Sequence, residues 1–219
     1  MLVSGGLDSA VALAEAAHEG PVAPVYVRSG LVWESAEIYW LERFLQTIGA
    51  PPLVVLNLPV ADLYGAHWSL TGDDPPGADS PDEAVYLPGR NLLLLSKAGV
   101  WAVANGCASI VMGPLAANPF PDGTRAFFDS MGGAIGLAMG LEDPLPVETP
   151  LSGLSKTEVV RRAAGLPIEL TFSCLSPTPD HRHCGECNKC AERRRGFADA
   201  GVDDPTAYAY GSRSGAGST

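Results

Sequence analysis

Short apolar runs alternate with longer segments of helical spacing along most of the chain. Runs of strand length occupy residues 21–27, 52–58, 109–112 and 147–150. Segments whose apolar residues recur every three or four positions cover residues 10–17, 34–48, 91–104, 124–139 and 156–164. In the second of these, one helical face carries Ile38, Leu41, Phe44, Leu45 and Ile48. Strands that alternate with helices predict an α/β fold with a parallel sheet.

Two kinds of segment interrupt this alternation and suggest how the chain is organised. Residues 71–84 are rich in Gly, Asp, Pro and Ser, which is typical of a loop. Cysteines gather near the end of the chain, and residues 211–219 are rich in Gly and Ser. We therefore expect an α/β domain over residues 1–172, a cysteine-bearing segment over 173–210 and a disordered tail over 211–219.

The composition is that of a globular protein and disfavours two classes of partner. The chain has 219 residues, of which 46% are hydrophobic and 18% charged, enough for one sizeable core. A formal net charge of −11 disfavours direct binding to a nucleic-acid backbone. No signal-peptide pattern and no apolar run of membrane-spanning length is visible. The expectation is a cytoplasmic protein that acts on a small molecule, with neither nucleic acid nor membrane as partner.

Residues 4–9, SGGLDS, have the composition of a phosphate-binding loop. Glycines let the backbone approach an anion, and the helix that follows directs free N–H groups to the same place. The hydroxyls of Ser4 and Ser9 add donors, and Asp8 suits a Mg²⁺ ion that bridges phosphate oxygens. The plainer alternative is a tight turn with a helix cap. The glycine spacing fits neither a Walker A loop nor a dinucleotide fingerprint.

Four of the five cysteines form the pattern C-x9-C-x2-C-x2-C, made by Cys174, Cys184, Cys187 and Cys190. In a chain without an export signal this pattern favours a metal over disulfides. Four thiolates around one Zn²⁺ make a closed, tetrahedral, structural site. The alternatives are an iron–sulfur cluster and replacement of Cys174 by His181 or His183. Cys107 stands alone and is interpreted as an ordinary buried thiol.

Several motifs together resemble a known family. SGGLDS resembles the signature of the N-type ATP pyrophosphatases, also called the PP-loop superfamily. With PGRN at 88–91, TFSC at 171–174 and the segment that begins CGECNKCAERRRGF at 184, the chain resembles the 7-cyano-7-deazaguanine synthases. The resemblance implies a parallel-sheet nucleotide-binding domain of the adenine nucleotide alpha hydrolase type, followed by a zinc-binding helical segment. It also implies a homodimer.

The family's chemistry is an ATP-dependent carbon–nitrogen ligation. ATP activates the carboxylate of 7-carboxy-7-deazaguanine as an adenylate, ammonia attacks to give an amide, and a second activation of the amide oxygen leads to the nitrile. The product is a precursor of the modified tRNA base queuosine. Activation is needed because a carboxylate oxygen leaves poorly, whereas AMP leaves readily.

The resemblance also assigns roles to particular residues of this chain. The expected nucleotide-binding residues are Val3, Ser4, Gly5, Gly6, Leu7, Asp8, Ser9 and Asn91. The expected catalytic residues are Asp8, Ser9, Arg90 and Lys156, and the expected substrate-binding residues are Phe120, Asp122 and Arg125. For Arg90 the alternative is a role at the start of a helix. For Lys156 two alternatives are weighed equally. The side chain reaches the phosphates, or it is solvated in the first helical turn beside a capping box formed by Ser155 and Glu158.

Two segments depart from the family pattern. Only Met1, Leu2 and Val3 precede SGGLDS, where the family has a full central strand, so either the strand is shortened or the start was assigned late. In residues 116–125, Pro121 and Asp122 match the family, but the preceding acidic position is lost and Asn118 lies nearby. Because a carboxylate is the natural partner for the N–H groups of a guanine-like edge, this loss puts the substrate in question.

Three hypotheses about function remain. The first is the nitrile-forming ligase that uses ATP, Mg²⁺, Zn²⁺ and ammonia. The second is a diverged relative that adenylates a different carboxylate or amide. The third is a non-catalytic nucleotide-binding remnant, which the intact SGGLDS, PGRN and cysteine motifs argue against.

Overall fold

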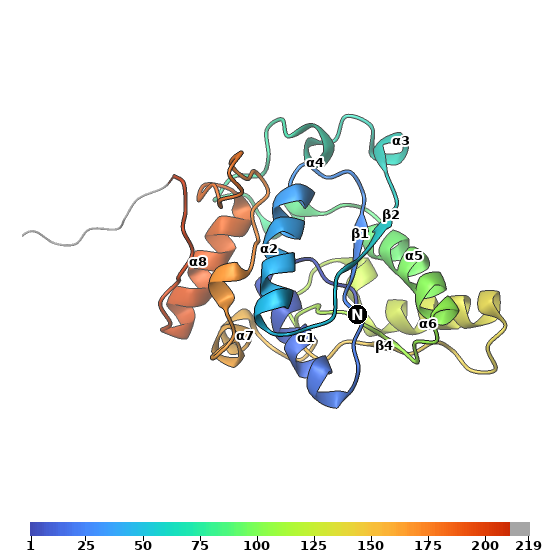
Figure 1. Cartoon of the computed structure of the whole chain (residues 1–219). Helices are drawn as coiled ribbons and strands as arrows, with labels where there is room; N and C mark the ends of the chain where they lie inside the picture. The colour runs from blue at the N-terminus through green and yellow to red at the C-terminus, as the bar shows by residue number, and fades with distance from the viewer. Residues whose placement is uncertain (211–219) are drawn as a thin grey trace, which may run out of the picture.

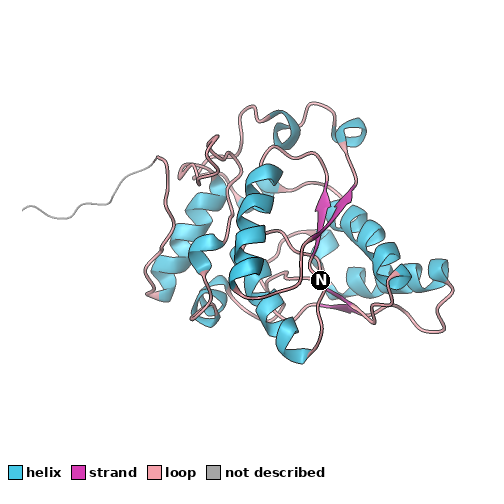
Figure 2. Ribbon diagram, in the orientation of Figure 1, coloured by secondary structure: helices cyan, strands magenta, loops and turns pink. Residues whose placement is uncertain are grey.

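Short parallel strands form the centre of the protein in a computed structural model that describes residues 1–210 (Figures 1 and 2). Strand β1 (Val25–Arg28) pairs in parallel with β2 (Val54–Asn57), and β3 (Ile110–Val111) pairs in parallel with β4 (Val147–Glu148). Leu2 bridges the two pairs, because it forms a parallel bridge with Val25 and its N–H donates to the carbonyl of Val111 at 3.0 Å. Residues 1–3 therefore take the central place in the order β2, β1, residues 1–3, β3, β4.

Helices cover both faces of these strands. Helices α5 (Arg90–Ala104) and α6 (Arg125–Met139) lie on one side, and α1 (Leu7–Glu19) and α2 (Glu34–Thr47) on the other (Figure 1). Period-two alternation explains this arrangement. Val27 joins the cluster beneath α5 and α6, whereas its neighbour Tyr26 joins the cluster beneath α1 and α2. Leu2 and Val3 alternate in the same way, so even the short central segment is packed on both faces.

The C-terminal helices pack against α1. Helices α7 (Lys156–Arg162) and α8 (Asn188–Ala200) share an apolar cluster with α1, to which Leu7, Val11, Val159 and Phe197 belong. The cysteine segment follows the 3-10 turn η3 (Ile168–Leu170) and includes α8. Immediately before it, the Phe172 N–H donates to the carbonyl of Gly5 at 2.7 Å, so the start of the segment is tied to the predicted phosphate loop.

The predicted α/β class with parallel strands is confirmed, and the main differences lie at the element boundaries. The strand expected over 21–27 begins only at Val25, because Pro21 and Pro24 have no N–H to donate. The first helix begins at Leu7, three residues earlier than the apolar pattern suggested. Short turns also interrupt the connections: α3 (Ala61–Tyr64), α4 (Trp68–Thr71), η1 (Asp82–Val85) and η2 (Pro121–Gly123). The tail expected over 211–219 lies outside the described residues.

Among the described residues, no helix combines the length and apolar character that crossing a membrane would require.

Candidate active site

A cavity of about 350 Å³ opens where the chain leaves the central segment and β3. Val3 and Ser4 line it at the end of the first segment, and Met112 and Gly113 line it just after β3. From the central segment the chain first builds β1 and β2 on one side and later β3 and β4 on the other. The cavity thus lies at the point where the strand order reverses, which is the usual ligand site of an open parallel sheet.

The loop over residues 4–9 borders this cavity through Ser4, Gly6, Leu7, Asp8 and Ser9. Gly5 has φ +76°, and a Cβ there would lie 3.1 Å from the carbonyl oxygen of Glu37, so the position favours glycine. The Ser9 Oγ accepts from the N–H of Ser4 at 3.1 Å, which closes the loop. Helix α1 starts at Leu7 without a side-chain cap. Its first turn is therefore a suitable anion site, because uncapped N–H groups and the helix dipole point the same way.

A network of charged side chains lies beside this loop. The Nζ of Lys156 donates to both carboxylate oxygens of Asp8, at 2.9 and 2.8 Å, and lies 3.1 Å from Glu192. Burial would lower the pKa of Lys156, but Asp8 and Glu192 outweigh it and raise that pKa. Burial would likewise raise the pKa of Glu192, but Lys156 and Lys189 lower it to about 2. Lys156 is therefore a fixed cation at the edge of the phosphate loop.

Both expectations for Lys156 describe part of its environment. Ser155 and Glu158 form the predicted capping box, in which the Ser155 N–H donates to Glu158 at 2.8 Å and the Glu158 N–H donates to Ser155 at 3.3 Å. The side chain of Lys156 nevertheless lines the cavity and is only 24% exposed. The cap sets the start of α7, and this start places the lysine opposite Asp8.

The PGRN motif supplies the opposite wall. Arg90 and Asn91 open α5 and line the cavity, after Gly89 has turned the chain with φ +72°. Among the described residues, the buried Nε of Arg90 has no hydrogen-bond partner. The backbone N–H of Asn91 donates to the Asp122 carboxylate at 2.9 Å, and its side-chain amide donates to the Asp122 carbonyl at 2.9 Å. Asp122 therefore fixes the start of α5.

The three predicted substrate residues are separated by the structure. Phe120 lines the cavity and stacks on Tyr86, with ring centroids 4.8 Å apart. Asp122 is buried beneath the start of α5 and is not among the cavity-lining residues. Arg125 is not among them either, since it binds the carbonyl of Val147 at 2.8 Å and the carboxylate of Asp129 at 2.7 Å. Of the three predicted substrate residues, only Phe120 lines the cavity.

The sequence analysis missed several cavity residues, among them Tyr26, Trp33, Glu37 and Trp68. Trp33 and Trp68 stack with their ring centroids 5.6 Å apart. The Tyr26 hydroxyl donates to Glu37 at 2.5 Å. Burial raises the pKa of Glu37 to about 7, against the opposing effects of Arg90 and Tyr26. Burial, together with the neighbouring Glu37, also raises the pKa of Tyr26. A glutamate in the first turn of a helix is usually solvated, so the sequence carried no signal that singled out Glu37.

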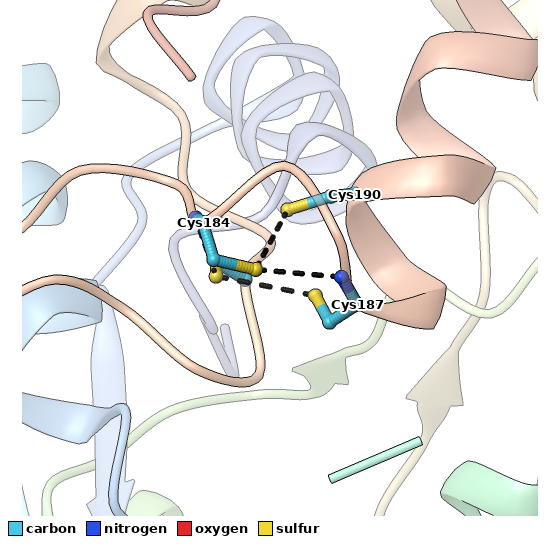
Figure 3. Close-up of side chains that lie close together, drawn as sticks. Cys184, Cys187 and Cys190 are labelled. Carbon is cyan, nitrogen blue, oxygen red and sulfur yellow. Dashed lines mark hydrogen bonds between the residues drawn. The ribbon is translucent and has the colours of Figure 1, made fainter. Parts of the chain in front are cut away.

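The cysteine pattern folds as expected into one compact cluster (Figure 3). The sulfur atoms of Cys174, Cys184, Cys187 and Cys190 all lie within 4.8 Å of one another and are buried. The Cys184–Cys190 and Cys174–Cys187 sulfur separations are 3.9 and 4.0 Å. Four sulfur ligands at about 2.3 Å from a zinc ion would stand about 3.8 Å apart. The cluster could therefore hold a metal ion with little rearrangement.

Hydrogen bonds around this cluster fit thiolate ligands. The backbone N–H groups of Cys184 and Gly185 donate to Cys174 and Cys190, at 3.2 and 3.4 Å. His183, which was weighed as an alternative ligand, accepts from the N–H of Ser173 at 3.1 Å through Nε2. Burial and the nearby Arg193 lower the pKa of His183 to about 3. Its position supports the loop that carries Cys174 and leaves the four sulfurs as the ligand set.

The fold and the site define a class of protein: an α/β protein whose candidate anion-binding loop lines one cavity together with Cys174, a member of a four-cysteine cluster that could bind a metal. A family model described as "Queuosine biosynthesis protein QueC" matches residues 1–201. The chain therefore belongs to the QueC family and is an enzyme of that family.

Relatives of similar length carry a consistent name. Proteins called 7-cyano-7-deazaguanine synthase are 33% identical in Desulfatibacillum aliphaticivorans, with 95% of both chains covered, and 35% identical in Azoarcus sp. strain BH72, again with 95% of both covered. The protein of that name from Methanothermobacter thermautotrophicus is 32% identical over 94% of this chain and 97% of its own.

The ionisation of Glu37 predicts a pH dependence of stability. The pKa of Glu37 rises from 4.5 to about 7 on folding, so the folded state binds the carboxyl proton more tightly than the unfolded state does. The folded state therefore has its full stability from this group below pH 4.5 and loses it as the pH rises through 7. At about 1.4 kcal/mol per pH unit, the free energy of unfolding should fall by about 3 kcal/mol through this group. Glu37→Gln should remove that loss, and the exposed Glu42→Gln on the same helix should retain it. Urea unfolding at pH 5 and pH 8 tests this, and identical pH profiles for all three proteins would contradict it.

Proposed function

We propose that this enzyme uses ATP to convert 7-carboxy-7-deazaguanine and ammonia into 7-cyano-7-deazaguanine. The observation that carries the proposal is the shared cavity. It joins a phosphate-type loop and a fixed lysine to aromatic walls of a size suited to a fused-ring base. The names of the relatives and the family match support the same reaction.

ATP would lie with its phosphates on the loop. The backbone of Val3, Gly5, Gly6 and Leu7 and the hydroxyls of Ser4 and Ser9 surround that space. The loop fits the group, because Gly6 borders the cavity without a side chain and the first turn of α1 has free N–H groups. Asp8 would hold Mg²⁺, since a carboxylate paired with one lysine still has free lone pairs. When bound, Mg²⁺ neutralises charge on the phosphate oxygens.

The reaction needs two activations of the same carbon. In the first, the substrate carboxylate attacks the α-phosphorus of ATP, and pyrophosphate leaves. Ammonia then attacks the acyl carbon, AMP leaves, and the nitrogen loses a proton to give the amide. In the second, the amide oxygen attacks the α-phosphorus of another ATP, pyrophosphate leaves and the nitrogen loses one proton. Loss of AMP and of the remaining N–H proton then leaves the nitrile.

Arg90 and Lys156 are the cations placed for this chemistry. Lys156 lies at the phosphate loop, and Arg90 lies across the cavity with an unpartnered Nε among the described residues. Preorganised cations stabilise the charge that develops on phosphorus in the transition state. Asn91 would position α5 beside the nucleotide, and Phe120 would contact the substrate ring. Asp122 would act only through Asn91, and we give Arg125 no role in binding.

A diverged substrate is the second candidate, because the acidic position expected in residues 116–125 is lost and Asn118, which lies near it, lines the cavity. The Asn118 side chain is held in place, since its Oδ1 accepts from the N–H of Phe120 at 3.0 Å. An amide there can donate as well as accept, so it would suit a base edge with a different donor pattern. The division at residue 172, the homodimer, the use of ammonia and a cytoplasmic location stay predictions.

Product formation tests the proposed function directly. Purified protein would receive ATP, Mg²⁺, an ammonium salt and 7-carboxy-7-deazaguanine, with mass spectrometry to detect the nitrile and an assay for pyrophosphate release. We expect both products. A protein that binds ATP and zinc but releases no pyrophosphate with this substrate would favour the diverged-substrate alternative.

Replacement of Asp8 should disable the phosphate chemistry. Asp8→Asn keeps the shape of the side chain but removes the charge proposed to hold Mg²⁺. We expect a loss of about 100-fold or more in kcat/KM for ATP-dependent turnover. The matched control is Glu19→Gln, at the exposed end of the same helix. Unchanged pyrophosphate release by Asp8→Asn would show that Asp8 does not bind the metal.

The cysteine cluster should hold zinc. Metal analysis is expected to give about one zinc per chain and no iron. Cys190→Ser should lose the metal and lower Tm by on the order of 10 °C, because metal binding contributes to folding. Cys107→Ser is the matched control, since Cys107 packs against the sheet core outside the cluster. Iron in the purified protein, or full zinc occupancy in Cys190→Ser, would contradict the assignment.

A further inference from the structure

The cavity contains a carboxylate whose role the proposed reaction leaves open. Glu37 lies in the first turn of α2, is only 8% exposed and borders the cavity. One oxygen of its carboxylate accepts from Tyr26, and no described residue donates to the other. A buried carboxylate with free acceptor capacity is costly unless a ligand completes its hydrogen bonds.

Glu37 is paired with an aromatic surface on the same helix face. Trp33 precedes it by four residues, and the Glu37 N–H donates to the Trp33 carbonyl at 3.0 Å, so the two side chains project from one side of α2. Trp68 stacks on Trp33, and both rings line the cavity. This arrangement offers a planar ring a surface to stack against and a carboxylate at its edge.

The donor pattern of the ring decides which base fits. An ionised carboxylate only accepts hydrogen bonds. A guanine-like ring presents two adjacent donors, N1–H and the 2-amino group, whereas adenine has an acceptor at N1. Glu37 therefore suits the base of the substrate better than the adenine of ATP. Asp8 and Glu192, the other carboxylates that line the cavity, are paired with Lys156, so Glu37 is the carboxylate without a cationic partner that could accept from such an edge.

We propose that Glu37 selects the substrate, accepting hydrogen bonds from N1–H and the 2-amino group of a 7-deazaguanine ring that stacks against Trp33 and Trp68. This inference takes the identity of the substrate from the proposed function. The recognition of a guanine-like base by Glu37 can be tested separately from the reaction.

Recognition by Glu37 should depend on pH. The charged and titratable groups that act on it are Tyr26 from β1, Glu34 from its own helix and Arg90 from α5. Since burial raises the pKa of Glu37 to about 7, the carboxyl loses its charge and part of its acceptor capacity below that pH. A base that needs the ionised carboxylate should bind more weakly at pH 6 than at pH 8.

Isothermal titration with two bases that differ by one amino group tests the proposal. The probes are 7-deazaguanine and 7-deazahypoxanthine, with a non-hydrolysable ATP analogue as the third ligand. We expect the wild type to prefer 7-deazaguanine by about 10- to 100-fold at pH 8, and less at pH 6. Glu37→Gln should erase the preference and leave the affinity for the ATP analogue unchanged. Glu42→Gln, on the exposed part of α2, should behave as wild type.

Several results would overturn the inference. These are a wild type that binds neither base or shows no preference, a preference that survives in Glu37→Gln, and a Glu37→Gln protein that loses the ATP analogue instead. The wild-type comparison and its pH dependence need no variant, so they decide the matter even if Glu37→Gln fails to fold. A wild type that forms the nitrile without the preference would overturn only this inference. The preference without nitrile formation would overturn only the proposed function.

Discussion

The hydrogen bond from the Phe172 N–H to the Gly5 carbonyl connects the C-terminal segment to the phosphate loop. Gly5 has a positive φ and lies against the Glu37 carbonyl on its other side, so the loop is held between α2 and the cysteine segment. A loop that binds phosphates through its backbone works only if its N–H groups are already aimed at the ligand. The shape of the nucleotide site therefore depends on a residue two positions before the first metal ligand.

Ion pairs also connect the phosphate loop to the C-terminal helices. Lys156 from α7 contacts Asp8 on α1 and Glu192 on α8, so three helices meet at one cation. The apolar cluster beneath it joins these helices, and Gly196 on α8 leaves no room for a Cβ, which would lie 2.9 Å from the Lys156 side chain. The packing of the C-terminal helices thus decides where the Lys156 charge lies, and the cysteine segment forms part of the cavity wall.

Much of this could be predicted from the sequence because local patterns carried it. The glycines of SGGLDS, the capping box at Ser155 and the cysteine spacing each specify their own geometry within a few residues. The amphipathic helices were found for the same reason. Strand limits were less predictable. The apolar run over 21–27 suggested a longer strand, but β1 begins only after Pro24.

The contacts that complete the cavity could not be predicted, because they join residues far apart in the chain. Nothing local distinguishes Glu37, which is buried against Tyr26 and Arg90, from a solvated glutamate in a first helical turn. The same holds for Trp33 and Trp68, whose stacking arises from a loop that carried no periodic pattern. Arg125 illustrates the converse, since its place in a motif suggested a ligand, whereas the fold pairs it with Asp129.

We infer that the metal-binding segment holds the phosphate loop in its binding conformation. The most direct test is the affinity of the whole protein for a non-hydrolysable ATP analogue before zinc removal, after removal and after zinc is returned. If the loop keeps its binding geometry only about a tenth of the time without metal, affinity should fall about tenfold and recover with zinc. Equal affinity in the zinc-loaded protein and in a folded, zinc-free protein would show that the loop is held independently of the cysteine cluster.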